Sequence, residues 1–235
     1  MICIIIPTYN EKENIFKLIN EIRAIISEAK IIVVDDSKEK LHKISEINNV
    51  SYIYRGSKLG RGSAVLDGMS EAIKDKRIEI FIEMDADFSH DPKELVRNID
   101  FFKKNKLNFL IASRYINNSK IINWPISRHL LSKVSNILAR LLLAVPIKDY
   151  TNGFRFYDKL AAEHILKSCK NSRSTGFIML SEIVIELYTN KFKILEISTV
   201  FLNRTRGESK VNFFELFKSL IGLLNLFVKK RILKK

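Results

Sequence analysis

The stretch of residues 78–87, with the sequence IEIFIEMDAD, constrains the fold more than any other segment. Its apolar residues alternate, which predicts a buried strand, and the run ends in two carboxylates separated by one residue. Because neighbouring side chains of a strand point to opposite faces, Asp85 and Asp87 are expected to project the same way from its carboxyl end. Open α/β sheets bind their ligands at that end.

The pair of carboxylates is a candidate metal site. Two carboxylates on one face repel each other unless a cation lies between them or one of them is protonated. Oxygen ligands of this kind suit Mg²⁺ or Mn²⁺, ions that also bind phosphate oxygens. The alternative is a solvated turn in which Asp85 and Asp87 cap the helix that follows Asp91-Pro92.

Length and composition indicate one globular domain with an anionic partner. The 235 residues can bury a sizeable core, and the net charge of +14 favours nucleic acid, phosphorylated ligands or an anionic membrane. Two cysteines, Cys3 and Cys169, argue against a disulfide scaffold and fit a reducing compartment. The first residues lack the basic segment of a signal peptide, and no apolar run reaches the roughly 18–20 residues of a membrane span.

Short apolar strands alternate with helical patterns through the first half of the chain. Strands are predicted at residues 2–6, 31–34 and 50–54, ahead of the strand described above, and helices at 15–26 and 64–73. This alternation predicts an α/β fold with a mostly parallel sheet flanked by helices. Each strand runs into polar residues, so Asp35, Asp36, Asp85 and Asp87 are expected at one edge of the sheet.

The second half has a less regular pattern. Residues 109–115 predict a further strand that delivers Arg114, and the polar stretch 116–125 is predicted to be mobile. Helices are predicted at 127–143 and 176–188, and a strand at 192–201. Residues 149–155 predict a turn followed by a short apolar edge, and residues 203–210 form a dense basic loop.

Four motifs of the first half resemble those of the family 2 inverting glycosyltransferases, which have the GT-A fold. They are residues 7–11 (PTYNE), 34–37 (VDDS), 59–62 (LGRG) and 85–90 (DADFSH). Three later motifs resemble one branch of that family, the dolichol-phosphate mannose synthases: residues 113–115 (SRY), 149–155 (DYTNGFR) and 204–210 (RTRGESK). The chain departs from the family pattern at residues 38–40 (KEK) and at Leu180, which bears on substrate contacts more than on the fold.

The resemblance implies a Rossmann-like GT-A catalytic domain over residues 1–212. It also implies the inverting transfer of a hexose from a nucleotide sugar to a polyprenyl or dolichyl phosphate. Mannose from GDP-mannose is the first choice, and glucose from UDP-glucose is the alternative. Mg²⁺ or Mn²⁺ held by Asp85 and Asp87 would stabilise the leaving nucleoside diphosphate. The implied nucleotide-sugar residues are Pro7, Tyr9, Glu11, Asp35, Asp36, Lys58, Gly60 and Asp85.

The acceptor in such a reaction attacks through a phosphate oxygen. That oxygen needs no strong general base, because the second pKa of a phosphate is about 6. Cations that hold and orient the phosphate matter more. The candidates are Arg114, Arg128, Arg204 and Lys210, and the expected catalytic residues are Asp87, Arg114 and Arg204.

Residues 213–235 predict an amphipathic, basic helix on a membrane surface. Apolar residues cover most of a helix from 213 to 228, polar residues form a narrow stripe, and five basic residues follow. We therefore expect peripheral binding at the cytoplasmic face of a membrane, where a membrane accessory subunit is a further partner that the resemblance allows. The alternative is that this helix packs on the catalytic domain or in a dimer.

Two other classes of protein share some of these features. A nucleotidyltransferase of related fold would need a basic loop after its first strand, where residues 7–11 are instead acidic. A non-enzymatic nucleic-acid-binding protein would suit the charge. No nucleic-acid-binding module is recognisable, however, and acidic residues gather at the strand ends, so no nucleic-acid partner is expected.

Overall fold

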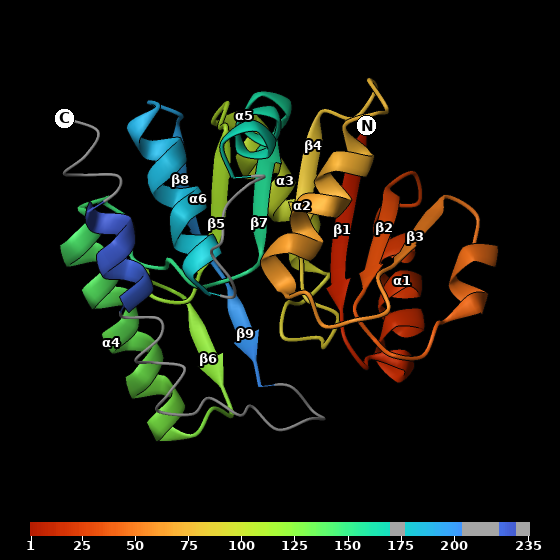
Figure 1. The fold of residues 1–235 in the computed structure, drawn as a ribbon, viewed down its shortest axis with the longest axis horizontal. Helices are drawn as coiled ribbons and strands as arrows, with labels where there is room; N and C mark the ends of the chain where they lie inside the picture. The colour runs from red at the N-terminus through yellow and green to blue at the C-terminus, as the bar shows by residue number, and fades with distance from the viewer. Residues whose placement is uncertain (170–176, 204–220, 229–235) are drawn as a thin grey trace.

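A seven-stranded sheet forms the centre of the computed structural model, which describes residues 1–169, 177–203 and 221–228. Its strand order is β3-β2-β1-β4-β7-β5-β8, and β7 alone runs antiparallel to its neighbours (Figure 1). The mostly parallel sheet predicted from the sequence is thus confirmed. The strands are β1 (Ile2–Thr8), β2 (Lys30–Asp35), β3 (Val50–Tyr54), β4 (Ile80–Glu83), β5 (Phe109–Ser113), β7 (Arg155–Asp158) and β8 (Ile194–Ser198).

The sheet departs from the sequence-based expectation in its second half. The apolar segment after the 149–153 turn, expected at an edge, is β7, which lies between β4 and β5 with Phe156 and Tyr157 buried. The strand predicted over 192–201 is divided at Thr199 into β8 and β9 (Val200–Leu202). β9 leaves the large sheet and pairs with β6 (Lys120–Ile122), which lies in the stretch predicted to be mobile.

Helices cover both faces of the large sheet. α1 (Lys12–Ile25) and α3 (Glu94–Lys104) lie on one face, and α2 (Arg61–Ala72), α5 (Lys159–Cys169) and α6 (Phe177–Thr189) lie on the other (Figure 1). The strands serve both faces because their side chains alternate. In β1, Cys3 and Ile5 join the cluster beneath α2, whereas Ile4 and Ile6 join the cluster beneath α1. A short 3₁₀ helix, η1 (His42–Glu46), connects β2 to β3.

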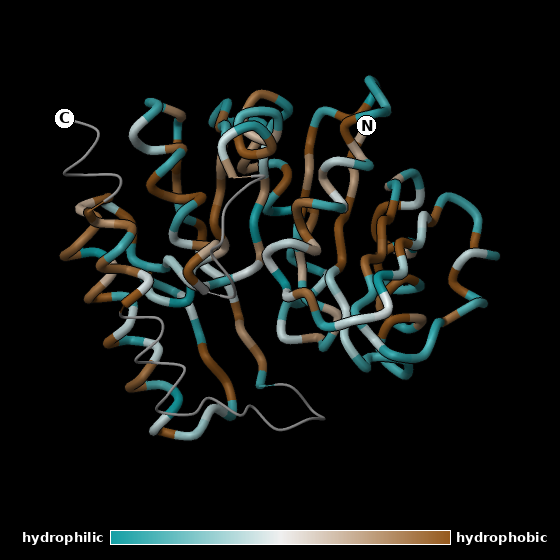
Figure 2. Tube along the Cα trace, in the orientation of Figure 1, coloured by the Kyte–Doolittle hydropathy of each residue, from teal (hydrophilic) through white to brown (hydrophobic). Residues whose placement is uncertain are grey.

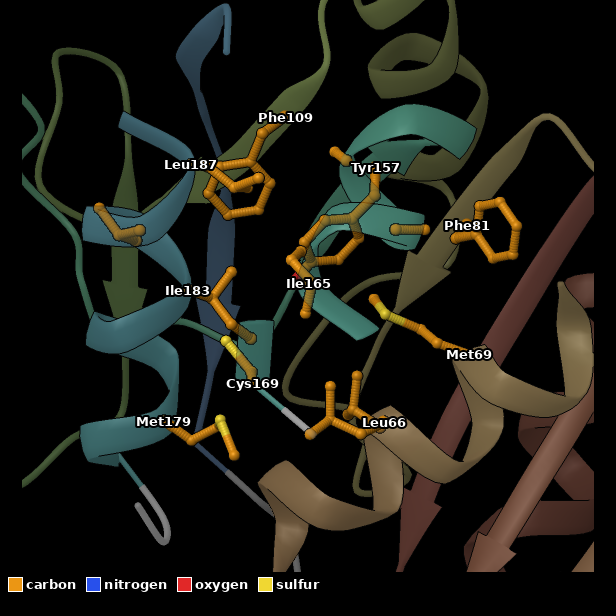
Figure 3. Packing of buried hydrophobic residues seen from close by; sticks show 14 of the residues in the cluster. Leu66, Met69, Phe81, Phe109, Tyr157, Ile165, Cys169, Met179, Ile183 and Leu187 are labelled. Atoms are coloured by element: carbon orange, nitrogen blue, oxygen red, sulfur yellow. The ribbon is translucent and has the colours of Figure 1, made fainter. Parts of the chain in front are cut away.

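The core beneath α2, α5 and α6 is built from aromatic rings on the sheet and aliphatic side chains on the helices. Figure 3 shows Phe81, Phe109 and Tyr157 facing Met69 and Ile165, with Ile183 and Leu187 of α6 packed alongside. The Phe109 and Tyr157 rings stack with their centroids 4.8 Å apart. Each large apolar side chain buried in this way contributes about 1.5–3 kcal/mol to stability. This core fixes the strands whose ends carry the loops described below.

α4 (Ile126–Leu143) lies outside this layered arrangement and mixes apolar with polar residues along its length (Figures 1 and 2). Ala139 and Leu143 are buried in the α2, α5 and α6 cluster. Residues 221–228 are helical and reach the same cluster through Leu223 and Leu226, while Gly222 lies against Ile178 of α6. Among the described helices, none has the length and apolarity that crossing a membrane requires.

Candidate active site

The carboxyl ends of β1, β2 and β4 meet at one edge of the sheet. These strands pair in parallel, with Thr8 beside Asp35 and Ile5 beside Glu83. Chain order reverses at β1, which has β2 on one side and β4 on the other, and ligands of open α/β sheets bind at such a crevice. The structure therefore brings the four acidic strand-end residues to one edge, as the sequence predicted.

Asp85 and Asp87 reach this edge from a turn rather than from the strand itself. β4 ends at Glu83, where the Met84 N–H still donates to the Ile5 carbonyl. Beyond that point Asp87 Oδ1 accepts hydrogen bonds from the Ser89 amide at 3.1 Å and the Ser89 hydroxyl at 2.6 Å. Strand alternation therefore does not set the direction of the two carboxylates, because β4 ends before Asp85.

Arg61, at the start of α2, holds the Asp85 carboxylate. Its Nε donates to Asp85 Oδ1 at 2.7 Å, and its Nη2 donates to the Gly153 carbonyl at 2.9 Å. Nη1 lies 3.7 Å from Oε2 of Glu83, a fully buried carboxylate. Burial disfavours the charge on Arg61, but the negative charges of Asp85 and Glu83 outweigh that effect and raise its pKa. A charged guanidinium is thus built into the acidic edge.

His90 holds the backbone of Asp85 through a hydrogen bond. This fully buried ring accepts a hydrogen bond from the Asp85 N–H at Nδ1, 3.0 Å away, and its Nε2 lies 2.9 Å from Asn152 Oδ1. The hydrogen bonds are consistent with a neutral ring whose Nε2–H donates. Burial also lowers the pKa of His90, more than the nearby Asp85 and Asp87 raise it. His90 therefore joins the segment of Asp85 to the loop of Asn152.

The two acids after β2 shape the neighbouring loops. Asp35 is fully buried; its Oδ1 accepts hydrogen bonds from Ser37 and its Oδ2 from the Tyr52 hydroxyl at 2.7 Å. Asp36 accepts from Arg55 Nε at 2.6 Å and from the Gly60 N–H at 2.8 Å. Gly60 has a φ of 101°, which side-chain-bearing residues rarely adopt. Asp35 and Asp36, both predicted as nucleotide-sugar residues, thus stabilise the loops that follow β2 and β3.

Other predicted nucleotide-sugar residues lie at the end of β1 and just after it. Tyr9 is 40% exposed after β1, and Lys58 Nζ lies 4.9 Å from the centre of its ring. Glu11 precedes α1, where its side chain accepts a hydrogen bond from Asn14 at 2.7 Å. Pro7 is the last but one residue of β1. An exposed ring beside a cation is a surface on which a nucleotide base can stack.

Arg114 lies in a buried ion pair. Its Nε and Nη2 donate to the two oxygens of Asp149, both at 2.8 Å, and Nη2 also donates to Thr151 Oγ1 at 2.6 Å. Burial would raise the pKa of Asp149, but the charge and hydrogen bonds of Arg114 hold it below its usual value. The sequence predicted a cation presented to an acceptor phosphate, whereas the Arg114 side chain is only 5% exposed and its charge is balanced by Asp149.

Arg128 lies nearer the surface, against an aromatic side chain. Its guanidinium carbon is 4.2 Å from the centre of the Trp124 ring, and Nη1 donates to Asn203 Oδ1 at 2.8 Å. Phe201 and Arg114 pack against the same tryptophan. Arg204 and Lys210, the other predicted acceptor residues, lie outside the described residues.

Several residues of this arrangement have no role in the sequence-based prediction. Arg61, Glu83, Asp149 and Asn152 lie inside the motifs described above, yet their partners are 22 to 92 positions away. Trp124 stands in the stretch predicted to be mobile. Asp149 could have been found from the position of Arg114. An arginine that directly follows an apolar strand is expected to be buried, and a buried arginine needs a carboxylate partner.

The acidic edge fits a divalent cation that takes part of its coordination from substrate. Among the residues that the structure describes, no group of three or more His, Cys, Asp or Glu side chains could form a complete metal centre. Mg²⁺ commonly binds through one or two carboxylates together with substrate phosphates and water. Asp85, 30% exposed, and Asp87 offer such a donor set.

Comparisons with known proteins identify the family of this chain. The model of the family "Glycosyl transferase family 2" matches residues 3–166. Polyprenol monophosphomannose synthase of Mycolicibacterium smegmatis is 30% identical over 97% of this chain and 88% of its own length. Dolichol-phosphate mannosyltransferase of Pyrococcus furiosus is 34% identical over 96% of this chain and 63% of its own length.

A solved structure confirms the fold. Glucosyl-3-phosphoglycerate synthase of Mycobacterium tuberculosis, crystallised with Mn²⁺, UDP and phosphoglyceric acid, superposes with a TM-score of 0.69 at 12% identity. The superposition covers 98% of this chain and 78% of that one. The expected GT-A fold is thereby confirmed.

Proposed function

The chain belongs to glycosyl transferase family 2, and we propose that it transfers mannose from GDP-mannose to a polyprenyl phosphate at a membrane surface. The observation that carries this proposal is the 30% and 34% identity, over nearly the whole chain, to relatives named as polyprenol- and dolichol-phosphate mannose transferases. The geometry of the sheet edge supports it, because partly exposed acidic side chains lie at the strand ends and Arg128 and Arg114 contact the Trp124 ring nearby.

The donor occupies the crevice between β1 and β4 in this proposal. Tyr9 and Lys58 offer a stacking surface to the base, and Asp36 and Gly60 hold the loop that lines the nucleotide. Asp85 and Asp87 would hold Mg²⁺ or Mn²⁺, which would stabilise the negative charge of the departing GDP. Arg61 and His90 keep Asp85 in place.

The acceptor approaches from the side of α4. Arg128, stacked on Trp124, is the described cation best placed to hold the acceptor phosphate, and Arg204 and Lys210 are the further candidates. Arg114 supports Arg128 through Trp124, because both guanidinium groups contact that ring and Asp149 holds Arg114 in place. A phosphate oxygen of the acceptor attacks the anomeric carbon of mannose, the bond from that carbon to GDP breaks, and the anomeric configuration inverts.

α4 carries an apolar stripe that suits the lipid surface where a polyprenyl phosphate is held. The stripe consists of five exposed residues spaced three or four apart: Ile126, Leu130, Val134, Ile137 and Leu141. Ile221, Leu224 and Val228 are also exposed, on the side of their helix opposite to the buried Leu223 and Leu226. The described part of segment 213–235 thus packs on the domain with one side and offers the other to the membrane. The protein binds peripherally, at the cytoplasmic face.

A transfer assay tests this function. Purified protein is incubated with Mg²⁺ or Mn²⁺, a polyprenyl phosphate in detergent or vesicles, and radiolabelled GDP-mannose, UDP-glucose or GDP-glucose in parallel. Label is expected in the lipid phase only with GDP-mannose and only when the acceptor carries its phosphate. Transfer from UDP-glucose alone would change the assigned sugar, and no transfer from any donor would contradict the proposal.

A further inference from the structure

We infer that Arg61 sets the charge of the metal site: beside Asp85, it weakens binding of the free divalent cation and strengthens binding of the donor's diphosphate. The inference deepens the function proposed above and rests on it, because it assumes that Asp85 holds the metal. Arg61 is a positioning and charge-setting residue in this account, and it need not touch the reacting atoms.

The guanidinium of Arg61 is held on three sides. Nε donates to Asp85 at 2.7 Å, Nη2 donates to the Gly153 carbonyl at 2.9 Å, and Nη1 faces Glu83 at 3.7 Å. Its contacts come from the end of β4, the turn after it, and the loop before β7. A guanidinium fixed in this way keeps its position without help from a ligand.

Glu83 explains why the arginine cannot simply leave when a metal arrives. This carboxylate is fully buried, and neither of its oxygens has a hydrogen-bond partner among the described residues. Its two cationic neighbours are Arg155, 3.5 Å away, and Arg61. Removing one partner of a buried ion pair is costly, because it leaves a poorly compensated charge inside the protein. Arg61 is therefore shared between Glu83 and Asp85.

Gly153 is a second, independent indication that the position of the Arg61 guanidinium is fixed. A Cβ atom at this position would overlap Nη2 and Cζ of Arg61. The φ of Gly153 is not in the left-handed region, so the space taken by the guanidinium, and not the backbone conformation, requires glycine here. The TNG motif before β7 and the LGRG motif before α2 thus meet in one contact.

The charge of Arg61 acts on the two ligands in opposite directions. A positive charge in contact with Asp85 repels a divalent cation bound to the same carboxylate, and it attracts the negatively charged diphosphate of the donor. Removing the charge should tighten the first interaction and weaken the second. Damage to the local structure would instead weaken both, so the signs of the two changes separate the two explanations.

The experiment measures both affinities in the absence of turnover. Free Mn²⁺ is titrated by electron paramagnetic resonance, and GDP binding is measured by calorimetry in chelator. For Arg61→Gln, we expect Mn²⁺ to bind about tenfold more tightly and metal-free GDP about tenfold more weakly than for the wild type. The matched control is Arg77→Gln, which removes an exposed arginine paired with Asp75 and should change neither affinity.

A second variant keeps every charge. Gly153→Ala displaces the guanidinium by contact with its flexible end, so the chain should fold, and both affinities should move as in Arg61→Gln by a smaller factor. If Arg61→Gln does not fold, this variant decides alone. The inference is overturned if both Mn²⁺ and GDP bind more weakly, or if neither affinity changes. If the wild type transfers mannose in that case, the proposed function stands. Opposite shifts in a protein that transfers no mannose would uphold the role of Arg61 and refute the function.

Discussion

The two halves of the sheet edge hold their charged side chains in different ways. In the donor half, residues 1–90, Asp36 pairs with Arg55 and Asp85 with Arg61, partners 19 and 24 positions apart. In the acceptor half, residues 107–203, Arg114 pairs with Asp149 across 35 positions and Arg128 with Asn203 across 75. Consecutive strand–helix units build the donor half, whereas an inserted antiparallel strand and the β6–β9 pair build the acceptor half.

The halves also differ in what their surfaces suit. Acidic residues and exposed Tyr9 line the donor crevice, which suits a soluble nucleotide and its metal. The acceptor half buries its central ion pair and exposes an apolar stripe on α4. In the proposed function, the first surface faces a soluble nucleotide and the second faces a lipid.

The largest expected effect comes from the donor half. Asp87→Asn should reduce mannose transfer by at least about a hundredfold. The substitution removes a negative charge from the proposed metal site, and the metal is needed to stabilise the negative charge that develops on the leaving GDP. Initial rates with saturating Mg²⁺ measure the loss, and circular dichroism checks the fold. Asp100→Asn, on the exposed side of α3, is the matched control and should retain wild-type activity. Full activity of Asp87→Asn, or of the wild type in excess chelator, would contradict the metal site.

The acceptor half should show its largest effect in stability. Asp149→Asn leaves the Arg114 guanidinium buried without its carboxylate, at a cost of about 3–5 kcal/mol in the free energy of unfolding. Urea denaturation at neutral pH measures this cost. A mutant within about 1 kcal/mol of the wild type would mean that the pair is dispensable.

The same substitution should alter the acid sensitivity of the fold. The pKa of Asp149 is lowered in the folded state, so its stabilising effect is present above the unfolded pKa of about 3.9 and is lost as the pH falls further. The wild type should lose stability more steeply than Asp149→Asn as the pH is lowered below about 4.

Much of the donor half could be predicted because its signals are local. Short apolar runs predicted β1 and β2, an alternating run predicted β4, and the parallel connections placed their acidic ends together. The turn after Glu83 could not be predicted, because strand alternation says nothing of where pairing stops. Most of the acceptor half depends on long-range pairing: β7 is short, and its buried Arg155 hides the apolar pattern of an interior strand.

The apolar stripe on α4 should give the smallest effect. Leu141→Glu is expected to weaken binding to anionic vesicles about tenfold, because it replaces an exposed leucine of the stripe by a charge that the lipid repels. Vesicle flotation at low salt measures the loss, and high salt should weaken binding of the intact chain. Leu160→Glu, at an exposed leucine on α5, is the control and should bind as the wild type does. Equal loss in both variants would mean that α4 has no special part in binding.

The claim that the two halves serve two substrates is tested most directly by the kinetics of Arg128→Gln. Each substrate is varied in turn, with Lys133→Gln, an exposed cation on the same helix, as the control. Loss of a charge-assisted contact to phosphate should raise the KM for the polyprenyl phosphate about ten- to a hundredfold. The KM for GDP-mannose should stay within about twofold of the wild type. A raised KM for GDP-mannose with an unchanged KM for the acceptor would contradict the division of the site.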